Sequence, residues 1–157
     1  MKVLAVLSFA VLAAAAPQED PKKRDAVKKA LEEMAKGTGA LDKLSVTWDD
    51  LHGLHGGLRL KVEGSGRITQ EAVRTNVGTP REKVDPKDLR RLVDALIAHE
   101  AWIQRVPERT PVPDESRARL TITVGDASST VWERYNDLVA NKRLVEIRDL
   151  LQKIAWK

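Results

Sequence analysis

The feature that most constrains the fold of this chain is a change of hydrophobic period, from strict alternation to helical spacing, which occurs twice. Residues 58–74 and 117–135 each contain two alternating segments around a short turn with glycine, Gly64-Ser65-Gly66 in the first and Gly125-Asp126-Ala127-Ser128 in the second. Alternation is typical of strands with one buried face, and two such strands around a turn predict a β-hairpin. Each hairpin precedes a segment with helical spacing, so we expect two ββα units.

Both segments that follow the hairpins carry the signals of a helix with one buried face. Asp85 is a good N-cap residue, Pro86 suits the first helical turn, and the apolar stripe contains Leu89, Leu92, Val93, Leu96 and Ile97. Asn141 can cap the second helix, whose stripe contains Leu144, Ile147, Leu151 and Ile154. A sheet with both helices on one face would bury every apolar stripe.

One more helix and one more strand are expected before the first hairpin. Residues 22–36 have helical spacing, but their apolar stripe is thin, so we expect this helix to dock loosely or to act partly as an arm. Alternation over 44–48 predicts a strand. The predicted fold class is α+β: a four- to five-stranded antiparallel sheet with two amphipathic helices on one face (ββα-ββα) and an N-terminal helix. We expect Trp48, Trp102, Trp132 and Trp156 in the core or at its edge.

The first sixteen residues have the three parts of a secretory signal: a basic start, an apolar run over 3–12 and a small-residue tract. The apolar run is shorter than the roughly 20 residues that span a bilayer, so we expect no transmembrane span. Because proline after the cleaved bond is unfavourable, Pro17 favours a cut after Ala15. The expected organisation is a signal peptide over 1–15, an N-terminal helix and hinge over 16–40, and a single α+β domain over 41–157.

Composition narrows the class of protein. The chain has no cysteine, which excludes thiol catalysis and cysteine zinc sites and favours a bacterial-type exported protein, secreted or periplasmic. Its 27 basic and 23 acidic residues are interspersed, so we expect no nucleic-acid partner. No serine lies in a strand-to-helix turn, and the adjacent pairs Asp49-Asp50 and Asp114-Glu115 have diverging side chains. We therefore expect a protein that is not an enzyme and uses no cofactor.

His52 and His55 lie just after Asp49 and Asp50, and this grouping suggests a metal site. Imidazole and carboxylate groups are ligands of zinc and copper, which need three or four ligands of fixed geometry. Glycines at positions 53, 56 and 57 favour a loop, so the alternative is a polar turn between two strands. On this pattern the protein is a small metal- or ligand-binding module of the cell envelope.

The connector 106–116 is the best candidate for binding a protein partner. Prolines at 107, 111 and 113 stiffen it, which reduces the entropy lost on docking. The partner-binding residues would be Arg109, Thr110, Val112 and Asp114. The alternative is an ordinary link between a helix and a strand.

Several motifs between Gly56 and Lys153 occur in the order found in a known family. They are Gly56-Gly57 at the start of a strand, a leucine-rich helix that ends near Trp102, the step Pro113-Asp114, the strand Leu120–Val124, and a closing amphipathic helix. In these motifs the chain resembles the emfourin family of small bacterial proteins, whose founding member inhibits thermolysin-type metallopeptidases. The resemblance implies a similar fold and a role as a peptidase inhibitor. The signal, the N-terminal helix and the His52–His55 loop depart from the family pattern.

These observations predict an exported, non-enzymatic domain that binds another exported protein, with a metallopeptidase as the sharpest candidate. The loops 49–57 and 106–116 would meet the target. The metal- or ligand-binding module that uses His52 and His55 is the alternative, and a structural module of the cell envelope is a third.

Overall fold

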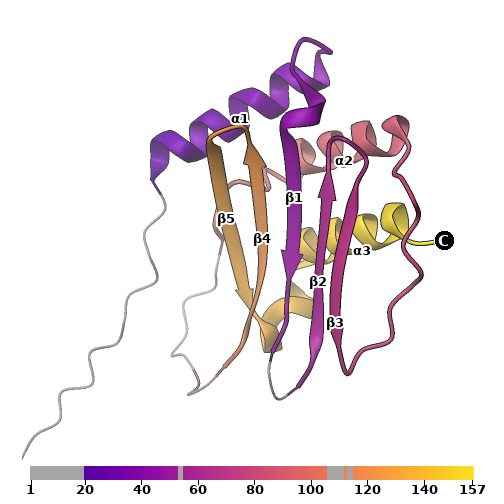
Figure 1. The fold of residues 1–157 in the computed structure, drawn as a ribbon. Helices are drawn as coiled ribbons and strands as arrows, with labels where there is room; N and C mark the ends of the chain where they lie inside the picture. Colours follow the sequence, from indigo (N-terminus) through magenta and orange to yellow (C-terminus); the bar gives the residue numbers. More distant parts are fainter. Residues whose placement is uncertain (1–19, 53–54, 106–111, 113–114) are drawn as a thin grey trace, which may run out of the picture.

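The computed structural model describes residues 20–52, 55–105, 112 and 115–157. Within them, five strands form one antiparallel sheet in the order β3-β2-β1-β4-β5, and the helices pack against one of its faces (Figure 1). The elements are α1 (Pro21–Ala35), η1 (Leu41–Lys43), β1 (Leu44–Asp49), β2 (Gly57–Glu63), β3 (Ile68–Val73), α2 (Pro86–Ala98), β4 (Arg117–Val124), β5 (Ala127–Arg134), η2 (Tyr135–Ala140) and α3 (Lys142–Ala155). The predicted α+β class is confirmed, with five strands. The proposed signal over 1–15 lies outside the described residues.

The two hairpins do not lie side by side, because β1 is inserted between them. Val46 of β1 lies opposite Val62 of β2 on one side and Ile122 of β4 on the other. Both predicted hairpins, β2–β3 and β4–β5, are present with antiparallel pairing. Strand β1 thus joins the two ββα units into one sheet, and β3 and β5 become its edge strands.

Every second residue of the central strands points toward the helices and forms the core. Trp48, Leu60 and Leu120, which lie opposite one another on β1, β2 and β4, are each 0% exposed. The indole Nε1 of Trp48 donates a hydrogen bond to Oδ2 of Asp50 at 3.0 Å, so its polar atom is satisfied in a half-buried site. Burial of such side chains is the main source of stability for a sheet covered by helices.

Helix α1 packs firmly, so the prediction that it docks loosely is wrong. Val27 and Leu31 are fully buried, and the helix lies against β5 and α2. Asp20 caps its first turn, since a carboxylate oxygen accepts a hydrogen bond from the backbone N–H of Lys22 at 3.0 Å. The apolar stripe of α1 is thin because the helix covers only the β5 side of the sheet. A few fully buried side chains are enough to fill the contact there.

The predicted caps of the other two helices are confirmed. Asp85 accepts from the backbone N–H of Lys87 at 2.7 Å, and Oδ1 of Asn141 accepts from the backbone N–H of Leu144 at 3.2 Å. These bonds satisfy N–H groups that have no partner inside the helix. They explain why α2 and α3 begin where the sequence indicates.

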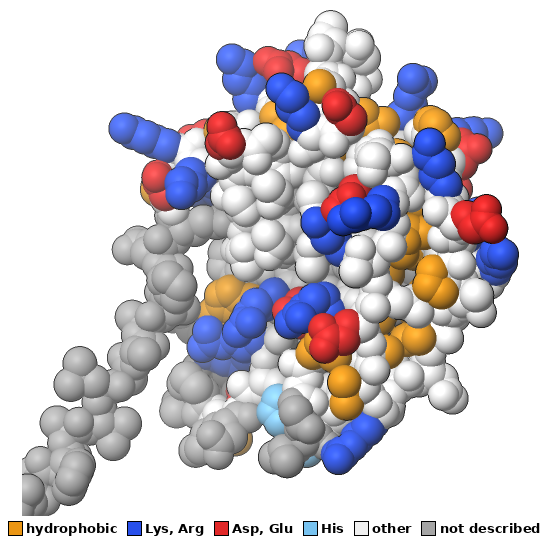
Figure 2. Space-filling view, viewed as in Figure 1, with side chains coloured by type: hydrophobic (Ala, Val, Ile, Leu, Met, Phe, Trp, Pro, Cys, Tyr) orange, Lys and Arg blue, Asp and Glu red, His pale blue; other side chains and the backbone are white. Residues whose placement is uncertain are grey.

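The other face of the sheet is open in the described part of the chain and is polar. Over β4 and β5 it carries hydroxyl pairs: the side chains of Thr121 and Thr130 lie 3.0 Å apart, and those of Thr123 and Ser128 lie 3.3 Å apart. Figure 2 views this face, with an uncharged area over the upper parts of these strands and charged side chains gathered below it. Within the described ranges, no helix is both long enough and apolar enough to cross a membrane.

Candidate functional site

The β1–β2 loop is a narrow tip closed by backbone hydrogen bonds. The N–H of His52 donates to the carbonyl of Gly56 at 3.0 Å, and the N–H of Gly56 donates back at 2.8 Å. Gly56 has φ of 83°, and a Cβ there would lie 2.2 Å from the carbonyl oxygen of Val73. Only glycine fits this position, so the glycine at position 56 has a steric reason.

The two histidines of this loop stack on each other. Their ring centroids lie 4.7 Å apart with 17° between the ring planes. The backbone N–H of His55 donates to Nδ1 of His52 at 3.3 Å. A ring nitrogen that accepts a hydrogen bond carries no proton, so a neutral His52 ring carries its proton on Nε2.

Asp49 and Asp50 bond to protein donors of the sheet. Both oxygens of Asp50 accept hydrogen bonds, Oδ2 from the indole of Trp48 and Oδ1 from the backbone N–H of Leu58 at 2.6 Å. Oδ2 of Asp49 accepts from Nε and Nη2 of Arg59 at 3.1 and 3.0 Å, and this contact raises the pKa of Arg59. Among the residues that the structure describes, no three histidine or acidic side chains gather in a way that could hold a metal ion.

The described residues of the two loops singled out in the sequence lie at the same end of the sheet. A groove of about 440 Å³ lies between them, lined by His52, His55, Gly56, Val112, Glu115, Ser116, Tyr135 and Asn136. Val112, a predicted partner-binding residue, is 53% exposed, and Tyr135 is 51% exposed. The other three predicted residues of the connector, Arg109, Thr110 and Asp114, lie outside the described residues.

Glu115 holds one wall of this groove in place. Its side chain is only 5% exposed and lies 3.8 Å from Nε of Arg134, measured from Oε2. Oε1 accepts from the side-chain amide of Asn136 at 3.2 Å, and Oε2 accepts from the backbone N–H of Val112 at 3.5 Å. The backbone N–H of Tyr135 also donates to the carbonyl of Ser116 at 3.0 Å. These contacts join the connector to the start of η2, so the groove is largely preformed.

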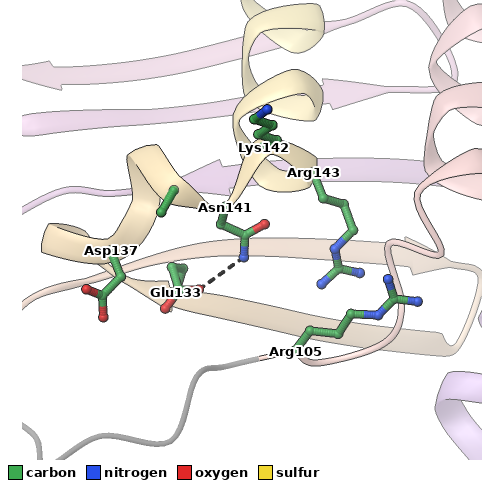
Figure 3. Close-up of a pocket in the computed structure, with 7 residues that line it drawn as sticks. Arg105, Glu133, Asp137, Asn141, Lys142 and Arg143 are labelled. Carbon is green, nitrogen blue, oxygen red and sulfur yellow. Dashed lines mark hydrogen bonds between the residues drawn. The ribbon is translucent and has the colours of Figure 1, made fainter.

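A second cavity, of about 460 Å³, lies at the junction of η2 and α3 (Figure 3). In it the buried Glu133 accepts hydrogen bonds from Nδ2 of Asn141 at 3.0 Å and from the backbone N–H of Arg134 at 2.9 Å. Arg105 and Arg143 line the same cavity, and Arg105 pairs with Glu100.

Arg143 in this cavity is a structural clamp. Its guanidinium donates to the carbonyl oxygens of His99, Glu100 and Ile103 at 3.2, 2.9 and 2.9 Å, which ties the end of α2 to the start of α3. Burial, together with the like charge of Arg105, lowers the pKa of Arg143. The polar groups of the cavity thus serve the packing of the helices, and the groove at the loop end is the stronger candidate for a binding site.

Sequence reasoning missed two residues that shape the candidate site. Tyr135 was read only as the end of a strand, although an exposed aromatic at a strand end is a usable signal. In the sequence Glu115 stands out only as one member of an adjacent acidic pair, because its partners lie on β5 and η2, about twenty residues further along the chain.

Comparisons with protein-family models, with curated proteins and with solved structures give no match for this chain. The resemblance to the emfourin family therefore stays a prediction from the sequence.

Proposed function

We propose that this protein is an exported, non-enzymatic domain that binds another exported protein through the loop end of its sheet, and that this target is a metallopeptidase which it inhibits. The observation that carries the proposal is the groove between the β1–β2 loop and the connector, with Val112 and Tyr135 exposed beside it. The emfourin-like order of motifs supports the choice of a peptidase.

The chemistry of the groove suits a protein partner. Tyrosine is enriched among the residues that dominate binding energy, because it offers a rigid, amphipathic surface. The Glu115 contacts hold Val112 and Asn136 in place before binding, which reduces the entropy that these residues lose on docking. The nearby carboxylates of Asp49, Asp50 and Glu115 all accept hydrogen bonds from protein donors, which favours a binding role over acid–base catalysis.

Two matched valine variants test the proposal. The purified protein is titrated against a panel of exported metallopeptidases, and we expect at least one to be slowed at micromolar excess. Val112→Asp places a charge in the groove and should abolish the inhibition. Val139→Asp makes the same change at a valine that is 84% exposed and does not line the groove, and it should inhibit like the wild type.

Either of two results would contradict the proposal. The first is that no peptidase of the panel is slowed or bound. The second is that Val112→Asp and Val139→Asp inhibit equally well, because the contact would then lie elsewhere.

The exported state has its own test. We expect the protein recovered from the envelope or medium of its bacterial host to begin at Ala16, as measured by intact mass and N-terminal sequencing. A mature chain that still begins at Met1 would contradict export by this signal.

A metal-binding role for the same loop is a second candidate, and the closeness of the imidazoles of His52 and His55, whose ring centroids lie 4.7 Å apart, favours it. Two imidazoles fill only half of a tetrahedral zinc site, so further ligands would have to come from a partner or solvent. Calorimetry with Zn²⁺ and Cu²⁺ tests the idea. If His52→Ala leaves any metal affinity unchanged, the loop is not the site.

A further inference from the structure

A row of side chains crosses the open face of the sheet at its loop end, one from each strand. The residues lie directly opposite one another in the register of the five strands: Trp132, Arg119, Asp49, Arg59 and Glu71. Directly opposite residues on one face of a sheet are close enough to interact. Ion pairing along this row therefore determines which charged side chains remain available to contact a partner.

The charges on the β2–β3 side of the row neutralise one another. Arg59 donates to Oδ2 of Asp49 at 3.0 Å and to Oε2 of Glu71 at 2.9 Å. Asp49 is the carboxylate opposite Arg119 as well, but its contact is with Arg59. Within the described part of the chain, the exposed side chain of Arg119 has no hydrogen-bond or ion-pair partner.

The β4–β5 side of the row combines this free charge with a fixed aromatic ring. The guanidinium carbon of Arg117 lies 4.0 Å from the centre of the Trp132 ring, in a cation–π contact. The side chain of Gln104 bonds both backbone groups of Trp132, accepting from its N–H at 2.6 Å and donating to its carbonyl at 2.7 Å. Trp132 is only partly buried, so a rigid aromatic platform faces solvent beside two arginines.

Among the residues that the structure describes, no carboxylate pairs with the arginines of the arginine–tryptophan patch, which we define as Arg117, Arg119 and Trp132. Arg59 is paired with Asp49 and Glu71, and Arg134 lies near Glu115. Figure 2 shows the charged lower part of the face next to the uncharged threonine area above it. Arginine and tryptophan are also the residue types most often found to dominate protein interfaces.

We infer that the arginine–tryptophan patch binds a carboxylate-bearing segment of the protein partner. This inference rests on the proposed protein-binding function and extends its surface. The patch lies close to the groove, because Arg117 directly follows Ser116, which lines the groove. A guanidinium donates two parallel hydrogen bonds to a carboxylate, and the unpaired Arg119 side chain beside the fixed Trp132 ring is a suitable donor for such a group.

The test uses a fluorescein-labelled peptide of alternating Glu and Ser, with a Gln-for-Glu peptide as the uncharged probe, measured by anisotropy on the full mature chain. We expect the acidic peptide to bind and the Gln peptide to bind at least about tenfold more weakly, which corresponds to about 1.4 kcal/mol. Arg119→Glu and Trp132→Ala should each weaken binding of the acidic peptide by at least about tenfold.

Two further variants keep the test interpretable. Arg119→Gln removes the charge without adding a new repulsion, and it should weaken binding by several-fold with an unchanged thermal midpoint. Arg90→Glu makes the same charge reversal at an exposed position on α2, on the helical side of the sheet, and should leave affinity within about twofold. Equal losses for Arg119→Glu and Arg90→Glu would show a general charge effect and overturn the inference, as would absence of binding to the acidic peptide.

Indole resonances locate the contact independently. In ¹H–¹⁵N spectra the Nε1–H signal of Trp132 should shift on addition of the acidic peptide. The indole N–H of Trp156, which donates to Gln70 at 2.9 Å on the far side of the sheet, should stay in place. A shift of Trp156 without one of Trp132 would overturn the inference.

Failure of this inference is distinct from failure of the proposed function. If a target peptidase is inhibited equally by the wild type and by Arg119→Glu, the protein-binding function stands and the acidic contact is wrong. If the acidic peptide binds at the patch and no peptidase of the panel is slowed, the proposed inhibitory function fails. The inference that the patch binds carboxylates then still stands.

Discussion

The two faces of the sheet, built from the same strands, do different work. Leu120 and Thr121 are consecutive residues of β4, yet Leu120 is fully buried under the helices and Thr121 bonds to Thr130 on the open face. The helix-covered face is apolar and contains Trp48 and Leu60. The open face carries hydroxyl pairs, ion pairs and the arginine–tryptophan patch. The difference indicates that the helix-covered face supplies most of the folding stability. The open face is therefore available to contact a partner.

The largest expected effect is a difference in stability between substitutions at two adjacent residues that point to opposite faces of the sheet. Leu120→Ala should lower the free energy of unfolding by about 2–5 kcal/mol, because it leaves a cavity in a fully buried site. Thr121→Ala should cost no more than about 1 kcal/mol, since it removes one half-buried hydroxyl contact. Urea denaturation measures both. Equal losses would show that the open face contributes to stability as much as the core.

The next effect concerns the clamp between the helices. Arg143→Ala should lower the free energy of unfolding by about 1.5–3 kcal/mol, because three carbonyls lose a charged donor. Its exposed neighbour Lys142 is the matched control, and Lys142→Ala should change stability by less than about 0.5 kcal/mol. If the two variants are equally stable in urea, the three carbonyl contacts of Arg143 contribute little.

A third change should affect binding and spare stability. Tyr135→Ala should weaken affinity for the target peptidase by at least about tenfold, as expected for a central aromatic, which corresponds to about 1.4 kcal/mol. Its side chain is 51% exposed, so the free energy of unfolding should change by less than about 0.5 kcal/mol. Titration calorimetry and urea denaturation of the same sample give both values. Loss of stability without loss of affinity would place Tyr135 with the structural residues.

The smallest effect is a pH dependence on the open face. A hydrogen bond from Lys61 lowers the pKa of Glu63 below its ordinary value of 4.5. A depressed folded-state pKa stabilises the fold at pH values above 4.5, and this contribution is lost as the pH falls through the folded pKa. Glu63→Gln should therefore be less stable than the wild type at pH 7, by under about 1 kcal/mol because the site is near the surface. The difference should shrink as the pH falls below 4.5 and vanish once the pH lies below the folded-state pKa, and thermal unfolding across this range checks the sign.

Much of the fold could be predicted because its signals are local. Alternation in 117–124, the Asp85 cap and the Asn141 cap depend on neighbouring residues alone, and each is present in the structure. The position of β1 between the hairpins depends on pairing with residues far along the chain, as at Val46 and Ile122. No local pattern specifies such a partner.

The candidate site was predictable only in outline. The two loops were singled out from glycine, histidine and proline content, but their meeting in one groove follows from the strand order. The contact of Glu115 with Arg134 and the clamp of Arg143 join residues that are distant in sequence. The free charge of Arg119 could be recognised only from the structure, because the register places Asp49 opposite both arginines and its side chain contacts Arg59.

Hydrogen–deuterium exchange of the protein with and without its target peptidase tests the central claim most directly. We predict that the complex protects residues 115–119 and 132–136 and the β1–β2 loop, and leaves exchange of α1, α2 and α3 unchanged. Protection confined to these helices, with the loop end and the open face unchanged, would contradict the division of the sheet into a stabilising face and a binding face.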